Sequence, residues 1–213
     1  RVEPRVHGLV LLGLLPSLVV GWMMAAMQHS VFAMELCYRL EAGSTLQSNV
    51  RSALARLPPF MRPQEKWEFY RWLAQTMGAH LAQAETGCWD FWDDEQKAKD
   101  DFAMWSNGMI TEEGARPTPS GSPDPYRGDP RYMTITVSWL LQRFTPSERS
   151  MAALCAIPET HLWRRDTFAR ILQGMNAVSF ASVKADVVYL LPRDPDWGLT
   201  AADLAHQKFH YLR

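Results

Sequence analysis

The feature that most constrains this chain is an apolar segment near its amino end, from Gly8 to Gln28. The segment contains no charged residue, and the next formal charge in the chain is that of Glu35. A helix rises about 1.5 Å per residue, so a helix over this segment would cross the roughly 30 Å hydrocarbon core of a bilayer. We therefore predict a transmembrane helix over about residues 8–28, and its span residues include Leu9, Leu12, Pro16, Val19, Trp22 and Met23.

Two other interpretations of this segment are weaker. A secretory signal peptide usually has a shorter apolar core followed by a small-residue cleavage site, and no clear site of this kind precedes Glu35. A buried helix of a soluble domain usually keeps a polar stripe. The pattern thus favours a lead and single span over residues 1–30, followed by one globular domain over residues 31–213.

Composition narrows the partners that such a chain can have. The net charge is −1 and the isoelectric point is near 6.7, which gives no reason to expect a nucleic-acid partner. The three cysteines, Cys37, Cys88 and Cys155, are widely spaced, and we expect them to be buried apolar residues rather than disulfides or metal ligands. Nine Trp and eleven Met either fill a core or line a surface that packs against another protein.

Periodicity along the globular part predicts an α+β domain. Alternating or β-branched residues predict strands over 31–40, 132–144 and 178–191. Capping residues and helical spacing predict helices over 44–57, 63–84, 93–106, 165–175 and 201–210, with a helical excursion over 145–158. We expect a small, mainly antiparallel sheet of about three strands flanked by helices, and a Pro/Gly-rich loop over 114–130.

The segment Cys88–Asp94 mixes aromatic with acidic residues. One interpretation is a docking knob that contacts a partner, and the other is a turn whose aromatic side chains fold back onto the core. The turn is favoured, because buried aromatic side chains are common in cores. If the aromatic residues contact a partner instead, the contact residues are Trp89, Phe91 and Trp92, joined by Tyr126 of the loop.

Motifs that carry catalytic chemistry are absent from the sequence: it has no Gly-rich phosphate loop, no H-E-x-x-H and no nucleophile elbow. His206 and His210 are four residues apart on a predicted helix, a spacing that would let them share a metal. A solvated helix face fits better, since no third His or Cys completes the site. We expect a protein that is not an enzyme and has no intrinsic cofactor.

Two further histidines, His7 and His29, flank the predicted span. A neutral imidazole there could ligate the magnesium of a chlorin or a haem iron. Interface histidines without ligands are commoner, so a peripheral chlorophyll contact is the weaker of the two interpretations.

The order of segments in the carboxyl-terminal half is familiar. A strand like Tyr132–Val137 is followed by a helix, then by the strand VKADVVYLLP (183–192), an acidic prolyl turn and a short helix over Leu199–Tyr211. In this order the chain resembles the DUF1517 family of cyanobacterial and plastid membrane proteins. The family's Glu and Trp in the last strand are replaced here by Asp186 and Tyr189.

The resemblance implies a single-pass protein of the chloroplast thylakoid membrane, and it carries over no catalytic residue. The expected role is a non-enzymatic accessory subunit of a photosynthetic complex, photosystem I before photosystem II, that serves assembly, stabilisation or antenna attachment. Its expected partners are the membrane, the protein subunits of that complex and antenna proteins. One alternative is a transient regulator of light acclimation, and another is a metal-dependent enzyme that uses His206 and His210.

Overall fold

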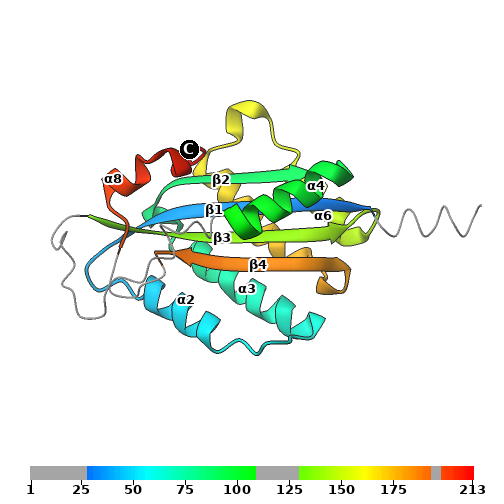
Figure 1. The fold of residues 1–213 in the computed structure, drawn as a ribbon, viewed down its shortest axis with the longest axis horizontal. Coiled ribbons are helices and arrows are strands. Elements are labelled where there is room, and N and C mark those ends of the chain that lie inside the picture. The colour runs from blue at the N-terminus through cyan, green and yellow to red at the C-terminus, as the bar shows by residue number, and fades with distance from the viewer. Residues whose placement is uncertain (1–27, 109–129, 193–197) are drawn as a thin grey trace, which may run out of the picture.

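The structure, a computed structural model, describes residues 28–108, 130–192 and 198–213. These residues form a four-stranded antiparallel sheet in the order β2-β1-β3-β4 (Figure 1). The predicted α+β fold, with an antiparallel sheet flanked by helices, is confirmed. The strands are β1 (His29–Leu40), β2 (Ala84–Trp92), β3 (Arg131–Gln142) and β4 (Val183–Leu191).

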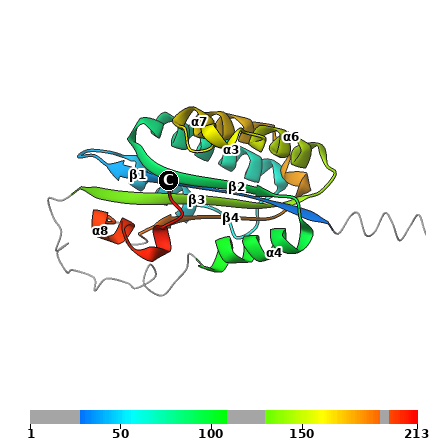
Figure 2. The ribbon, with the colours of Figure 1, turned by 90° about the horizontal axis from the view of Figure 1, so that it is seen from above.

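Helices cover both faces of the sheet. Figure 2 shows α3, α6 and α7 on one face, and α4 and α8 on the other. The order β1-α2-α3-β2 recurs as β3-α6-α7-β4, so two similar units meet along the central β1–β3 pair, although the sequence shows no internal repeat. The helices are α2 (Leu46–Ala55), α3 (Pro63–Ala79), α4 (Glu95–Ala103), α6 (Pro146–Cys155), α7 (Arg165–Gly174) and α8 (Ala201–Leu204).

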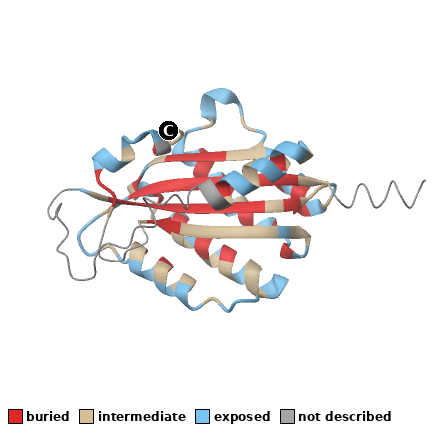
Figure 3. Cartoon of the chain, viewed as in Figure 1, coloured by how far each residue is buried: buried red, intermediate tan, exposed pale blue. Residues whose placement is uncertain are grey.

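The main core lies between the sheet and the α3–α7 layer. Alternate residues of β1 point into it, as the period of two in the sequence predicts. Trp139 of β3 is fully buried at its centre, and the rings of Phe32, Tyr70 and Phe180 surround it at centroid distances of 5.2–5.4 Å. Figure 3 shows buried residues running along the two central strands. The β1 residues that enter this core are Phe32, Met34, Leu36 and Tyr38.

The sheet has four strands rather than the predicted three, because residues 84–92 form β2. Our prediction placed the end of a helix and an aromatic turn there, but α3 ends at Ala79 and β2 pairs with β1 from Val31↔Trp92 onward. The segment AETGCWDFW combines strand-favouring Thr and aromatic residues with Ala, Glu, Gly and Asp, which disfavour strands, so its local preference is mixed. Pairing with the central strand β1 therefore decides its structure.

Two boundaries near the carboxyl end also differ from the prediction. β4 begins at Val183 rather than at 178, because residues 175–177 and 180–182 form short 3-10 turns. The last helix, α8, ends at Leu204 instead of continuing to 210, and a 3-10 turn follows over Gln207–Phe209. Thr200 caps α8 as predicted, since its hydroxyl accepts a hydrogen bond from the Asp203 amide at 3.1 Å.

Several predictions concern residues outside the described ranges. They include nearly all of the predicted span (about 8–28) with its residues Leu9, Leu12, Pro16, Val19, Trp22 and Met23, and also His7, Tyr126 and most of the 114–130 loop. Of the helices in residues 28–108, 130–192 and 198–213, none combines the length and apolar character that a membrane crossing requires.

Candidate functional site

A buried carboxyl group lies at the centre of the sheet, on the face opposite α3 and α7. Glu35 of β1 has no exposed surface. It is in register with Cys88 of β2 and Thr136 of β3, and Thr134 lies on the same face of β3. The alternation of β1 that sends Met34 and Leu36 into the main core sends Glu35 to the other side of the sheet.

The carboxyl-terminal segment covers this carboxyl group. The Tyr211 hydroxyl donates a hydrogen bond to Oε2 of Glu35 at 3.1 Å. Arg213 and Gly87 exchange two backbone hydrogen bonds of 2.9 Å, which fasten the last residue to β2. The Trp105 ring meets the Tyr211 ring edge-on, with centroids 5.8 Å apart. Glu35 is thus enclosed by segments that lie far from it in sequence.

Burial controls the protonation of this cluster, which we call the Glu35 cluster (Glu35, Thr134, Thr136, Tyr189 and Tyr211). Burial raises the pKa of Glu35 to about 7, and the hydroxyls of Thr134, Thr136 and Tyr211 act in the opposite direction. Within the described residues, Oε1 of Glu35 and the two threonine hydroxyls have no hydrogen bond of ordinary geometry. Burial also raises the pKa of Tyr211 and of Tyr189, whose hydroxyl contacts the Trp105 carbonyl. The cluster can bind and release a proton near neutral pH.

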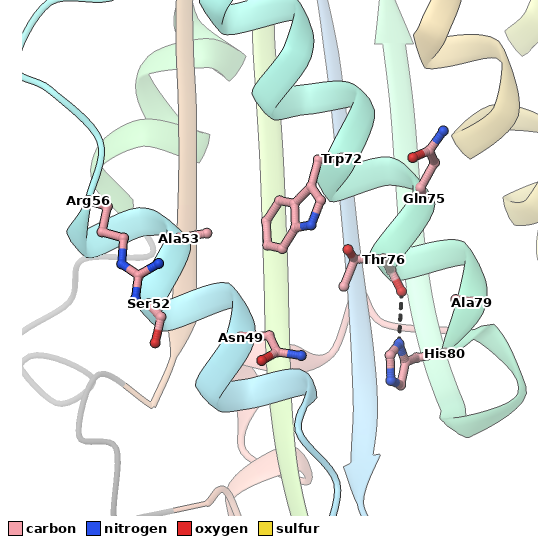
Figure 4. Close-up of a pocket in the computed structure, with 9 residues that line it drawn as sticks. All are labelled: Asn49, Ser52, Ala53, Arg56, Trp72, Gln75, Thr76, Ala79 and His80. Carbon is pink, nitrogen blue, oxygen red and sulfur yellow. Dashed lines mark hydrogen bonds between the residues drawn. The ribbon is translucent and has the colours of Figure 1, made fainter.

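A groove of about 700 Å³ lies elsewhere, between α2 and α3 (Figure 4). Trp72 and Thr76 of α3 face Asn49 of α2 across it, and the ring of His80 is held by its Nδ1 contact with the Thr76 carbonyl at 2.9 Å. The remaining polar residues of its lining carry amide, hydroxyl or guanidinium groups rather than carboxylates. The lining thus offers one histidine and no carboxylate.

A third feature is the sheet end at which β1 begins. His29 opens β1, and Trp92 closes β2 opposite Val31, so two residues that the sequence singled out lie at the same end. Phe144, two residues beyond β3, lies at this end as well, and its side chain is 57% exposed. We call this surface, formed by Trp92 and Phe144 with the cations Lys97 and Arg143, the aromatic end.

The predicted partner-contact residues of β2 divide between core and surface. Trp89 is buried, and its Nε1 donates a hydrogen bond to the Leu162 carbonyl at 2.8 Å. Phe91 is partly buried against the main core. Trp92 is 38% exposed. Since successive side chains of a strand alternate between the two faces, β2 does not present these aromatic residues as one surface.

The predicted histidine sites are not assembled as the sequence suggested. α8 ends before His206, and His210 follows a separate 3-10 turn, so the two imidazoles do not occupy consecutive turns of one helix. Asp203 is engaged with Thr200. At the other end of the sheet, burial, followed by the charge of Lys99, lowers the pKa of His29, and its Nδ1 has no hydrogen bond within the described residues.

Sequence reasoning missed Glu35 and Phe144. The period of two puts Glu35 and Arg39 on the same face of the strand, but Glu35 is buried under Tyr211 of the carboxyl-terminal segment while Arg39 is exposed. A lone acid inside an otherwise apolar strand is the signal that could have identified it. Phe144 stands in the left-handed region at φ 62°, which no local pattern indicates. In the described residues, His, Cys, Asp and Glu form no group of three or more that could hold a metal.

The described residues form a four-stranded antiparallel α+β domain with the enclosed Glu35 cluster at the centre of its sheet and the aromatic end at one edge of the strands. No family model, no curated protein and no solved structure matches the chain.

Proposed function

We propose that this chain is a membrane-anchored, non-enzymatic accessory subunit of a photosynthetic membrane complex. One observation carries the proposal: β1, which starts at His29 directly after the uncharged segment 8–28, is a central strand paired on both sides with β2 and β3. A span joined in this way to the middle of a sheet has no flexible linker. It would hold the domain at a fixed place beside the bilayer, which is a property of structural subunits.

The chemistry of the described domain supports a role without catalysis. The Glu35 cluster is enclosed by the carboxyl-terminal segment and is therefore closed to a substrate. Burial raises the pKa of Cys37 and Cys155 to about 12, so neither thiol is an activated nucleophile at neutral pH. His206 and His210 lie on separate turns rather than on one helix face, which favours the non-enzymatic role over a metal-dependent enzyme that uses both.

The order of segments, which resembles that of the DUF1517 family, supports the thylakoid membrane as the location. The complex that we propose is a photosystem, I before II, and the role is assembly, stabilisation or antenna attachment. His29, at the start of β1, is the described histidine that a peripheral chlorophyll would meet beside the span. A transient regulator of light acclimation remains the alternative if the chain associates with no complex.

Two measurements test the proposal. Carbonate washing of membranes should leave the chain in the pellet, and a variant with Leu12→Arg and Val19→Arg should be released, because charges inside the span oppose insertion. After mild solubilisation, the chain should migrate with a pigment–protein complex on native gels, and mass spectrometry should identify the co-migrating subunits. Migration as a free monomer would overturn the accessory-subunit role, and release of the unaltered chain by carbonate would overturn the anchor.

A further inference from the structure

The aromatic end gathers strand ends that meet the incoming apolar segment. The Arg143 amide donates a hydrogen bond to the Gln28 carbonyl at 3.0 Å, so the turn after β3 is bonded to the last residue of that segment. β2 reaches the same end, because Trp92 pairs with Val31. Figure 1 shows β2 and β3 ending on the side where β1 begins. Whatever surrounds the apolar segment therefore lies next to this surface.

The exposed position of Phe144 is held by specific contacts. Its left-handed backbone is a strained conformation for a residue with a large side chain. The buried carboxylate of Glu148 accepts hydrogen bonds of 3.2 Å from the Phe144 amide and from the Ser30 hydroxyl of β1. Arg149 donates a hydrogen bond of 2.8 Å to the Phe144 carbonyl. The structure thus keeps an aromatic ring in solvent beside the start of β1, although burying this ring in the core would have stabilised the fold more.

Each exposed ring of this end lies against a cation, and the Nε1 of Trp92 also contacts the Asp90 carboxylate. The Lys97 ammonium lies 2.9 Å from the ring centroid of Trp92, and the Arg143 guanidinium lies 5.1 Å from that of Phe144. Arg143 also forms an ion pair with Asp93 at 3.8 Å. Aromatic rings flanked by long cationic side chains are the composition that proteins place at the bilayer–water interface, where the rings meet acyl chains and the cations meet phosphates.

From this arrangement we propose that the aromatic end rests in the phospholipid headgroup layer of the bilayer that holds residues 8–28. This inference rests on the proposed anchor and adds the orientation of the domain: β1 leads away from the membrane. The strand spans roughly 37 Å, at about 3.4 Å per residue, so the turn at Glu41–Ser44 lies far from the lipid.

The experiment uses the full chain in vesicles of phosphatidylcholine and phosphatidylglycerol that contain a headgroup-spin-labelled lipid. One fluorophore is placed through Lys184→Cys, at the exposed start of β4 near the aromatic end, and another through Ala42→Cys, in the exposed far turn. Both variants carry Cys155→Ala, while Cys37 and Cys88 are buried. We expect strong quenching of the label at position 184 and none at position 42, because contact quenching does not reach across the sheet.

A double variant and a matched control test the role of the aromatic residues themselves. Trp92→Thr combined with Phe144→Gly should abolish most of the quenching at position 184. The fold should survive these changes, since threonine suits a strand end and glycine suits the left-handed backbone at 144. Trp163→Thr is the matched control: Trp163 is 44% exposed but lies in the α6–α7 connection beside β2, and its loss should leave the quenching unchanged.

The outcomes separate this inference from the anchor. Carbonate washing of the same vesicles reports whether the chain stays inserted. If it does and the two labels are quenched equally, or if the double variant is quenched like the unaltered chain, the lipid contact is wrong and the anchor stands. If carbonate releases the chain, both proposals fall.

Discussion

Tyr211 and Glu35, which are 176 residues apart in the chain, are joined by a hydrogen bond of 3.1 Å between hydroxyl and carboxylate. This bond links the carboxyl-terminal segment to the centre of the sheet. Burial of Glu35 raises its pKa to about 7, and this shift couples the stability of the fold to the protonation of one acid.

The contribution of Glu35 to the free energy of unfolding should therefore fall as pH rises from about 4.5 to about 7. The folded-state pKa of Glu35 lies above its ordinary value of 4.5, so the folded chain binds this proton more tightly than the unfolded chain does. The resulting stabilisation is complete below pH 4.5 and is lost as pH rises through 7, a change of about 3 kcal/mol.

Glu35→Gln removes the titrating group and should flatten this dependence. The variant should unfold at a higher temperature than the unaltered chain at pH 8 and at a similar temperature at pH 5, as measured by circular dichroism in detergent. Glu159→Gln, which changes an exposed carboxylate, should leave the slope unchanged. An unchanged slope in Glu35→Gln would mean that another group controls the pH response.

Tyr211→Phe should loosen the carboxyl-terminal segment. It removes the donor to Glu35 at a cost of about 1–2 kcal/mol, and the cost should be larger at pH 8, where the acceptor is charged. Hydrogen exchange of the Gly87 amide is the readout, because this amide donates to the Arg213 carbonyl. Tyr38→Phe removes a similar bond on the opposite face, to the Met77 carbonyl, and should not accelerate exchange at Gly87.

Gly87→Ala and Gly78→Ala should have opposite effects on stability. A Cβ at Gly87 would lie 2.6 Å from Cδ2 of Leu36 and 3.0 Å from the Glu35 carbonyl oxygen, so overpacking should cost about 1–3 kcal/mol. A Cβ at Gly78, in α3, meets nothing within 4 Å and should stabilise the helix by about 0.5–1 kcal/mol. Urea denaturation measures both, and equal effects would contradict the pairing of β2 against β1.

Asp186→Ala should destabilise the α3–β4 contact. Asp186 contacts the Lys66 ammonium and accepts a hydrogen bond from the buried Tyr70 hydroxyl at 3.0 Å. Leaving that hydroxyl unpaired should cost about 1–3 kcal/mol in the free energy of unfolding. Arg62→Ala, which breaks an ion pair with Glu65 at the exposed start of α3, should change stability little. An equally small effect at Asp186 would show that water replaces the carboxylate.

Local sequence patterns were sufficient to predict the helices and strands whose residues have a clear propensity for one structure. Residues 31–40 alternate, and residues 132–144 are rich in β-branched and aromatic side chains. Pro63 opens α3 in the first turn, where the backbone N–H that proline lacks has no partner within the helix. The α+β class and the antiparallel sheet follow from such segments. β2 could not be predicted in this way, because its residues have mixed local preferences and their backbone pairs with β1 and with Arg213, which only folding brings beside them.

The candidate sites depended on tertiary structure more than the helices and strands did. The sequence alone determined an uncharged segment over 8–28, a strand directly behind it and the absence of familiar catalytic motifs. Contacts between distant segments decided that Glu35 is buried under Tyr211, that His206 and His210 lie on separate turns, and that Phe144 is held outward by Glu148. The physical reason is that propensity and periodicity act over a few neighbouring residues, whereas desolvation, strand pairing and strained backbone require partners that the chain brings together only on folding.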